Sequence, residues 1–158
     1  MSTLTGMLRL LIGLISVSGG GGSVPEACPE ESHREAVVLI DRQTVVFLEN
    51  GREVNVSLVS TGRAGYNTPL GEFNVLYRRR SPVSSTYNVR MPYWLCITPS
   101  GQIGLHQTFR SGTNNLGTRQ SHGCVRMGFI TARWSYDWLR VGSPVRILAE
   151  GPGRLTGD

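Results

Sequence analysis

The segment AVVLIDRQTVVFLENGREVNVSLVS, residues 36–60, carries the pattern that decides the fold. Two runs within it, 36–40 and 44–48, are rich in β-branched side chains, which favour strands. Asn50-Gly51 supplies the positive φ angles of a tight hairpin turn. Residues 54–58 then alternate apolar and polar side chains, which is typical of a strand with one buried face. The domain is therefore expected to begin with antiparallel strands.

The rest of the domain extends this pattern and adds one helix. Residues 72–77 are expected to form a further strand of an antiparallel sheet, and residues 142–148 a closing strand. Three apolar side chains recur every four residues and predict a helix packed on the sheet: Ile130, Trp134 and Trp138. The predicted fold class is mainly β, with one short helix near the C-terminal end.

A nucleophile and two candidate bases stand close together in the second half of the chain. Ser121, His122, Gly123 and Cys124 are consecutive, and His106 lies eighteen positions before the cysteine. A thiol with a pKa of about 8.5 is mostly protonated at neutral pH, so a catalytic cysteine needs a base or a cation nearby. The glycine removes a side chain from a tight corner, which lets consecutive N–H groups face a developing oxyanion. The pattern predicts a cysteine acyl-transferase.

Spacing alone does not choose between the two histidines. His122 would share a face with Cys124 on an extended strand, whereas His106 must arrive from a neighbouring strand. A structural interpretation, with a packed histidine and a buried cysteine, is the ordinary one for an isolated thiol. A metal-binding module is a second alternative, but the three side chains lack a paired Cys-x-x-Cys. The clustering of serine, histidine, glycine and cysteine with a further histidine favours catalysis.

These residues resemble the signature of the YkuD-like L,D-transpeptidases, enzymes that cross-link peptidoglycan. The resemblance covers about residues 36–149, which are expected to form the catalytic domain. It rests on His106, on Ser121-His122-Gly123-Cys124-Val125-Arg126 and on pieces in matching order: Ser60-Thr61-Gly62, Thr68-Pro69-Leu70-Gly71-Glu72-Phe73, Met91-Pro92-Tyr93-Trp94 and the 142–148 strand. It implies a YkuD-like antiparallel β-sandwich with one short helix after the catalytic segment.

The resemblance also implies a role for each residue of the site. Cys124 would be the nucleophile, His106 the base that takes its proton, and His122 a support for the hydrogen-bond network. The backbone N–H groups of Gly123 and Cys124 would form the oxyanion hole. The backbone carbonyl of Gln107 would orient the imidazole, as a carboxylate does in a serine protease triad.

Two positions depart from the family pattern, which often has glycine in place of Gln107 and asparagine in place of Arg126. Arg126 could share a face with Cys124, where a guanidinium would favour the thiolate and bind a substrate carboxylate. The alternative is a surface arginine paired with an acidic side chain. Tyr93 and Ser121 are expected to be further substrate contacts.

The two ends of the chain differ in composition from the domain. Residues 1–22 are expected to be a signal peptide or membrane leader with a glycine-rich spacer, because the apolar run at 10–17 has the length of a secretory h-region. Residues 23–35 are expected to form an acidic flexible tether, and residues 150–158 a flexible tail. The resulting expectation is export to the periplasm or cell envelope.

Two further cysteines fit an exported protein. Cys28 and Cys96 could pair in an oxidising compartment. Cys96 lies in the apolar run 93–97, which favours a core position instead. Lipidation of Cys28 is disfavoured, because Pro25 and Glu26 precede it where small or aliphatic residues are needed.

All sixteen basic residues are arginine, and the net charge of +5 suits an anionic partner such as cell-wall polymer, lipid headgroups or nucleic acid. The run Arg78-Arg79-Arg80 lacks interleaved aromatic residues, which favours a solvated loop over a nucleic-acid interface. No nucleic-acid partner is expected, and membrane contact is expected only through an uncleaved leader.

The expected function is two-step acyl transfer on peptidoglycan stem peptides. A thioester on Cys124 forms first, and an acceptor amine then resolves it, without a metal or organic cofactor. The nearer alternative is a hydrolase on the same residues, in which water resolves the thioester.

Overall fold

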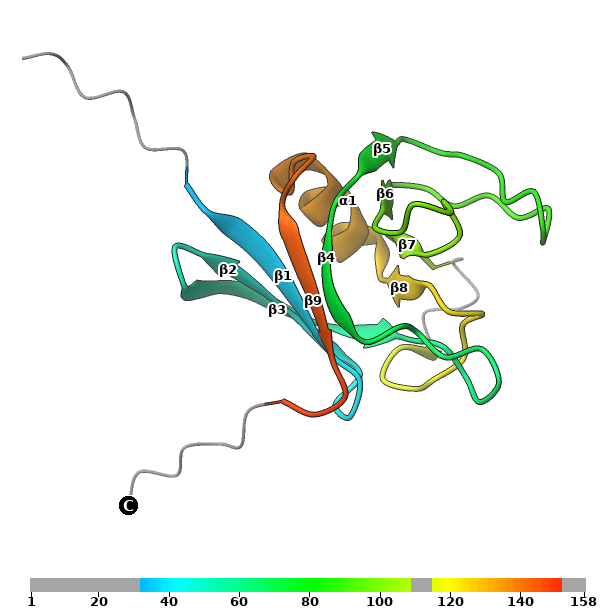
Figure 1. The fold of residues 1–158 in the computed structure, drawn as a ribbon, viewed down its shortest axis with the longest axis horizontal. Coiled ribbons are helices and arrows are strands. Elements are labelled where there is room, and N and C mark those ends of the chain that lie inside the picture. The colour runs from blue at the N-terminus through cyan, green and yellow to red at the C-terminus, as the bar shows by residue number, and fades with distance from the viewer. Residues whose placement is uncertain (1–31, 109–114, 152–158) are drawn as a thin grey trace, which may run out of the picture. The chain divides into compact units, whose positions relative to one another are not determined.

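A computed structural model describes residues 32–108 and 115–151 of the chain. Within these ranges nine strands form one sheet in the order β4-β9-β1-β2-β3-β8-β7-β6-β5, with a single helix (Figure 1). The elements are β1 (Arg34–Leu39), β2 (Thr44–Glu49), β3 (Arg52–Ser60), β4 (Gly71–Asn74), β5 (Tyr77–Arg79), β6 (Trp94–Cys96), β7 (Gly104–Gln107), β8 (Val125–Met127), α1 (Phe129–Trp138) and β9 (Pro144–Leu148). The predicted mainly β fold with one helix is confirmed, and the predicted sandwich is a single curled sheet.

The predicted N-terminal hairpins are present. β1, β2 and β3 pair in antiparallel register, and Asn50 and Gly51 take φ angles of 52° and 76° in the turn between β2 and β3. β1 begins earlier than expected, because Arg34 and Glu35 pair with β2 and are not part of a tether. The predicted leader at 1–22, most of the tether and most of the tail lie outside the described residues.

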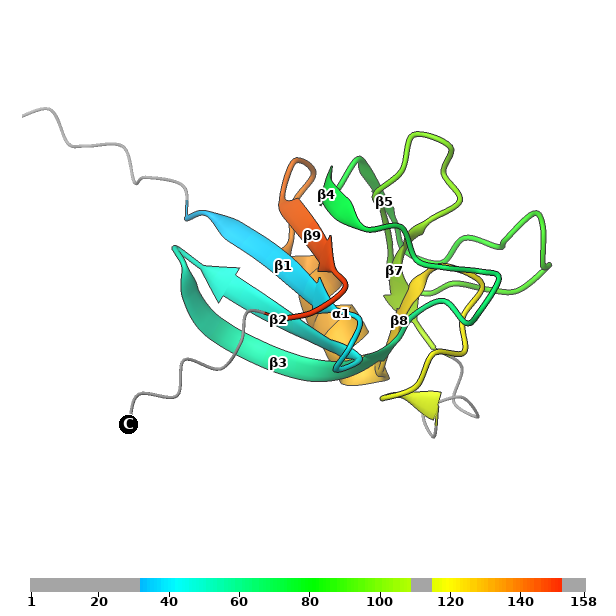
Figure 2. The same ribbon diagram turned by 60° about the horizontal axis from the view of Figure 1, so that its bottom comes forward.

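The prediction that the apolar residues of 54–58 are buried is wrong. Val54, Val56 and Leu58 are 46%, 46% and 52% exposed and lie on the outer face of β3. The inner face carries polar Ser57, whose hydroxyl accepts a hydrogen bond from Thr131 of α1 at 2.8 Å. Only the last two residues of β3 are buried, and these pair with β8. Figure 2 shows β3 as the long curved strand that joins the two halves of the sheet.

Two strand pairs are parallel, contrary to the predicted antiparallel sheet. β1 pairs with β9 and β7 with β8 in parallel. Parallel partners need a long connection, and a large part of the domain lies between β1 and β9.

The strand predicted at 72–77 is two strands on opposite edges of the sheet. β4 pairs with β9, whereas β5 pairs with β6. Between them, Val75 N–H donates to the Ser143 carbonyl at 2.9 Å, and Leu76 N–H donates to the Cys96 carbonyl at 2.8 Å. The chain thus steps from one edge to the other within two residues, so the curled sheet comes close to closing on itself (Figure 1).

Helix α1 packs its aromatic residues on the sheet. The Phe47 ring of β2 meets Trp134 edge-on at 5.0 Å and Trp138 at 6.0 Å, and the two indoles stack at 4.9 Å. Ile130 was expected in the same stripe but is 81% exposed, because Ala132 takes the buried position on this part of the helix. No helix within the described ranges has the length and apolar character needed to cross a membrane.

We expect Phe47→Ala to lower the free energy of unfolding by about 3–5 kcal/mol, because it empties the contact between the sheet and both tryptophans of α1. Val54→Ala is the matched control on the exposed face and is expected to cost under about 1 kcal/mol. Urea unfolding monitored by tryptophan fluorescence measures both. Equal costs for the two variants would contradict the central role of Phe47 in this core.

Candidate active site

The parallel pairing of β7 with β8 brings the predicted nucleophile and base to one face of the sheet. Leu105 pairs with Val125, and both are fully buried in the core. His106 pairs with Arg126 one position further along, on the opposite face. One position before, the same register sets Gly104 opposite Cys124. Cys124, Arg126 and His106 therefore share a face, with the cysteine and the histidine diagonally placed.

The Cys124 thiol is half-buried and protonated in this environment. Its Sγ–H donates to the carbonyl of Gln102 at 3.4 Å. Burial raises the pKa of the Cys124 thiol, while the Gly104 N–H and the positive charge of Arg126 oppose the rise. The sulfur thus has a backbone donor and a guanidinium available to stabilise a thiolate when one forms.

The imidazole of His106 is held in one orientation and kept neutral. Its Nδ1–H donates to the Gln107 carbonyl at 2.7 Å, the bond predicted for the base, and this leaves the lone pair on Nε2. The ring is 6% exposed and lies 5.8 Å from the Trp94 ring. Burial lowers the pKa of His106 to about 4, against the effect of the Gln107 bond and with help from Arg126. The side chain is thus a neutral base at neutral pH.

The turn before the cysteine is held by two buried hydroxyl groups. Gly123 has a φ of +116°, and a Cβ there would lie 2.8 Å from Ile103 Cδ1, so glycine is required. Ser121 Oγ accepts from Gly123 N–H at 3.0 Å and donates to the Cys124 carbonyl. Thr68 Oγ1 donates to the Gly123 carbonyl at 2.7 Å and accepts from Gly62 N–H at 2.8 Å. Thr68 belongs to one of the motif pieces, but its position in the sequence does not indicate this contact with a turn 55 residues away.

The same bonds change the predicted oxyanion hole. The Gly123 N–H is already bonded to Ser121 Oγ, so it can serve an oxyanion only by sharing or releasing that partner. The other donor of the predicted pair is the backbone N–H of Cys124 itself.

Two predicted substrate contacts, Ser121 and Tyr93, are engaged in contacts within the fold. Ser121 is fully buried, and its hydroxyl is occupied by the bonds within the turn. The Tyr93 ring packs on α1, 6.1 Å from Phe129 and 5.8 Å from Tyr136, because a positive φ of 57° at Tyr93 directs the chain there. A substrate contact by either side chain stays a prediction.

His122 packs among aromatic rings and does not extend the predicted hydrogen-bond network. The Tyr66 ring meets it edge-on at 4.8 Å, and the Tyr87 ring lies tilted over it at 4.5 Å. Its ring forms no hydrogen bond with any described residue. Burial and the charges of Arg63 and Arg126 lower its pKa. The three rings form a wall beside the turn that carries Cys124.

The other described cysteine is a core residue. Cys96 is fully buried and free, and its thiol donates to the Thr98 carbonyl at 3.3 Å. The pairing with Cys28 cannot be compared with the structure, because Cys28 lies outside the described residues.

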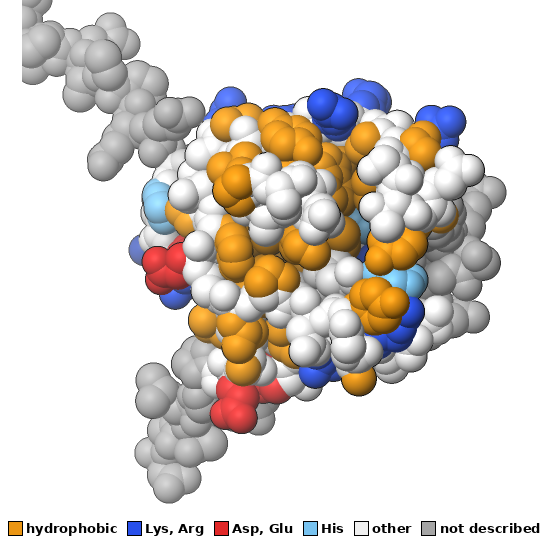
Figure 3. Space-filling view, turned by 45° about the vertical axis from the view of Figure 1, so that its right-hand side comes forward, with side chains coloured by type: hydrophobic (Ala, Val, Ile, Leu, Met, Phe, Trp, Pro, Cys, Tyr) orange, Lys and Arg blue, Asp and Glu red, His pale blue; other side chains and the backbone are white. Residues whose placement is uncertain are grey.

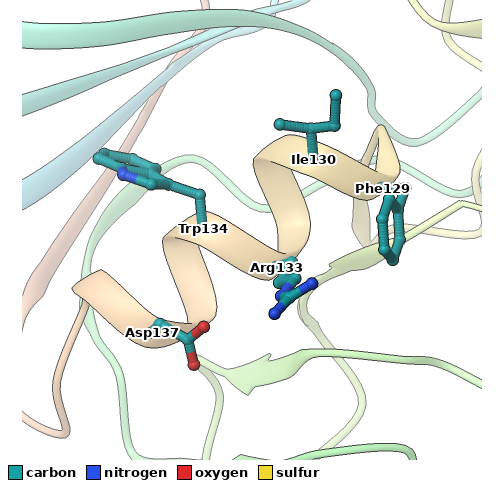
Figure 4. Close-up of a pocket in the computed structure, with 5 residues that line it drawn as sticks. All are labelled: Phe129, Ile130, Arg133, Trp134 and Asp137. Carbon is teal, nitrogen blue, oxygen red and sulfur yellow. The ribbon is translucent and has the colours of Figure 1, made fainter.

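No metal site accompanies the thiol. In the ranges that the structure covers, no group of three or more His, Cys, Asp and Glu side chains could hold a metal ion. A surface hollow along α1, drawn in Figure 4, is lined by Phe129, Ile130, Arg133, Trp134 and Asp137. None of the residues that line this hollow is a nucleophile, and none belongs to the face that carries Cys124.

We expect Thr68→Val to lower the free energy of unfolding by about 1–3 kcal/mol, because it leaves the buried Gly62 N–H and Gly123 carbonyl without their partner. The variant should also change the rate at which Cys124 reacts with a thiol reagent, because the turn that carries it loosens. Thr118→Val removes an exposed hydroxyl that bonds to the Asn115 carbonyl of its own loop; it is the control and should change neither quantity. Unchanged stability and labelling in Thr68→Val would show that this hydroxyl does not hold the turn.

Comparison with known proteins agrees with this geometry. Residues 33–147 match the model of the YkuD family, described as the L,D-transpeptidase catalytic domain. L,D-transpeptidase 1 of Mycobacterium tuberculosis is 24% identical over 124 residues, which cover 71% of this chain and 49% of that protein. The chain thus spans about half the length of this relative.

Solved structures show the same fold. An L,D-transpeptidase from Mycobacterium smegmatis superposes with a TM-score of 0.71 at 24% identity, over 75% of this chain and 59% of that one. L,D-transpeptidase 3 from Mycobacterium tuberculosis, solved in complex with a faropenem-derived adduct, has a TM-score of 0.64 at 26% identity, over 73% and 60%. The chain belongs to the YkuD family of L,D-transpeptidase catalytic domains.

Proposed function

We propose that this protein is an L,D-transpeptidase that acts on peptidoglycan stem peptides through a thioester on Cys124. The observation that carries the proposal is the placement of Cys124 and His106 on one face of the parallel β7–β8 pair, in a chain of this family. The relatives named above are L,D-transpeptidases, which supports the same reaction class.

The first step begins from two neutral groups. The Cys124 proton, which faces the Gln102 carbonyl, turns toward Nε2 of His106 as the sulfur attacks the carbonyl of the third residue of a tetrapeptide stem. A C–S bond forms, and the carbonyl oxygen gains negative charge beside the Cys124 N–H. The tetrahedral intermediate then expels D-alanine, whose amine takes the proton from the imidazolium.

The second step reverses the roles of the same groups. An acceptor amine attacks the thioester and passes a proton to His106, and the Cys124 thiolate leaves and takes that proton back. The new amide joins two stems. The Gly104 N–H and Arg126 stabilise the leaving thiolate, as they oppose the rise in the thiol pKa in the free enzyme.

Export to the cell envelope follows from the same proposal. The substrate lies outside the cytoplasm, and the apolar run at 10–17 has the length of a secretory h-region. Residues 1–22 are proposed as the leader, 23–35 as the tether apart from Arg34 and Glu35, which begin β1, and 36–149 as the catalytic domain.

We expect a carbapenem to add its mass once to the wild-type protein, with the adduct mapped to Cys124, because the strained lactam carbonyl takes the place of the stem carbonyl. Intact-protein mass spectrometry followed by peptide mapping measures this. Cys124→Ala should form no adduct, whereas Cys96→Ala, at the buried core thiol, should form it as the wild type does. An adduct retained in Cys124→Ala would refute the nucleophile.

Muropeptide analysis separates transfer from hydrolysis. Purified stems incubated with the wild-type protein should yield cross-linked dimers and free D-alanine. Shortened stems without dimers would show that water resolves the thioester, and the activity would be that of a hydrolase on the same site.

We expect the Cys124 thiol to stay protonated from about pH 5 to pH 8. Burial raises the pKa of the thiol above the ordinary value of 9.0, and burial lowers the pKa of His106 to about 4. The ultraviolet absorbance of the thiolate, taken as wild type minus Cys124→Ser, should therefore show no step in this range. A step between pH 5 and pH 8 would mean that a preformed thiolate–imidazolium pair exists, contrary to the neutral pair derived above.

A further inference from the structure

Positive charge is concentrated on the half of the molecule that carries the thiol. No aspartate or glutamate occurs between Glu72 and Asp137, a stretch that holds eight arginines: Arg78, Arg79, Arg80, Arg90, Arg110, Arg119, Arg126 and Arg133. The ion pairs within the described ranges lie outside this stretch and join Arg34 to Glu49, Arg42 to Asp41 and Arg146 to Glu35. Figure 3 shows acidic side chains on one flank of the face in view and basic ones without acidic neighbours on the other.

Two arginines from different parts of the chain lie at the turn that carries Cys124. Arg126 shares the face of the thiol, and its Nη1 donates to the Gln120 carbonyl at 3.4 Å. Arg63 lies just beyond β3, where its backbone N–H donates to the Ser121 carbonyl at 3.1 Å. Its guanidinium lies 4.3 Å from the centre of the Tyr66 ring, which in turn packs on His122. Both arginines thus lie beside residues 120–124, Arg126 through its side chain and Arg63 through its backbone and its contact with Tyr66.

Among residues 32–108 and 115–151, no carboxylate pairs with either of these two cations. Arg126 is half-buried, and burial lowers its pKa, with a further lowering from the charge of Arg63. Each guanidinium keeps N–H groups free beyond its single contact with a carbonyl or a ring. A partly buried cation next to another cation is costly unless an anion lies between them. The arrangement therefore favours the binding of an anion beside the sulfur.

We propose that Arg63 and Arg126 form a carboxylate subsite beside Cys124, which holds the terminal carboxylate of the residue that leaves the donor peptide. The inference rests on the acyl transfer proposed above and adds the chemistry by which the donor is selected. The forked guanidinium binds a planar carboxylate through paired hydrogen bonds. A donor whose last residue is amidated would leave both cations unbalanced and would be disfavoured.

The spacing along the strand is compatible with binding of the terminal carboxylate. The carboxylate of the leaving residue lies one residue beyond the attacked carbonyl, about 3.5 Å further along an extended chain. The Cα atoms of Cys124 and Arg126 are two residues apart on a strand, about 6.6 Å, and an arginine side chain spans the remaining distance. The wall formed by Tyr66, His122 and Tyr87 closes the same side of the turn and can pack on the aliphatic part of the donor.

Two synthetic tetrapeptide stems test the subsite, one ending in D-alanine and the other in D-alaninamide. Mass spectrometry of the released residue measures kcat/KM for each donor. The wild-type protein should prefer the free carboxylate by roughly tenfold to a hundredfold. Arg63→Gln should reduce this preference by slowing the D-alanine donor, with turnover of the D-alaninamide donor largely retained. Arg126→Gln should slow both donors, because Arg126 also stabilises the thiolate, but it should slow the D-alanine donor more, so that the preference falls in this variant too.

Arg133→Gln on the exposed surface of α1 is the matched control, because it removes one positive charge without touching the turn, and it should keep the wild-type preference. If Arg126→Gln slowed both donors equally, the subsite would be overturned, because Arg126 would then act only by stabilising the thiolate of Cys124. Equal turnover of both donors by the wild type would refute the subsite alone. Turnover of neither would refute the proposed function and the subsite together.

Discussion

The parallel register between β7 and β8 is the constraint on which the site depends. Leu105 and Val125 are locked together in the core, and their burial leaves no freedom to shift the pairing. A slip of one residue would move every neighbouring side chain to the opposite face. The face shared by His106, Arg126 and Cys124 is therefore set by apolar packing on the other side of the same two strands.

Close approach of the backbone completes this arrangement. Gly104 lies between the cysteine and Trp94, and a Cβ there would lie 2.8 Å from the indole and 2.4 Å from the Leu95 carbonyl. The bare glycine lets the indole cover the strand beside the base, and its N–H remains near the sulfur. The hydroxyl groups that hold the Gly123 turn fix the other side of the thiol. Rigid, buried contacts thus fix the positions of the thiol and the imidazole.

Electrostatics assign different tasks to the groups on this face. Burial keeps both the thiol and the imidazole neutral, so the charge of the reaction appears only when the proton moves. Arg126 favours the thiolate and disfavours the imidazolium, and with Arg63 it adds uncompensated positive charge at the turn. An incoming carboxylate would balance that charge at the time when the carbonyl is attacked. Substrate binding and activation of the nucleophile are coupled through the same guanidinium.

Sequence patterns predicted the elements that depend on local chemistry. Asn50-Gly51 marked a turn that requires positive φ, and β-branched runs marked β1 and β2. The motif around Cys124 named the residues that meet at the site, because its spacing belongs to one family. The strand predicted at 72–77 is divided between two sheet edges, since period-two alternation carries no information about which strand is the partner.

The amino-acid sequence alone determined the fold class, the family and the cysteine and histidine that share one face of the sheet. Only the tertiary structure decided the tasks of the side chains around them. The Ser121 hydroxyl forms hydrogen bonds within the turn. The Tyr93 ring packs on the helix, and the His122 ring packs against two tyrosines. Spacing along a strand specifies a face, whereas the partner of a polar group depends on which distant segment packs there. Arg63 reaches the site for that reason, through a strand far from Cys124 in the sequence.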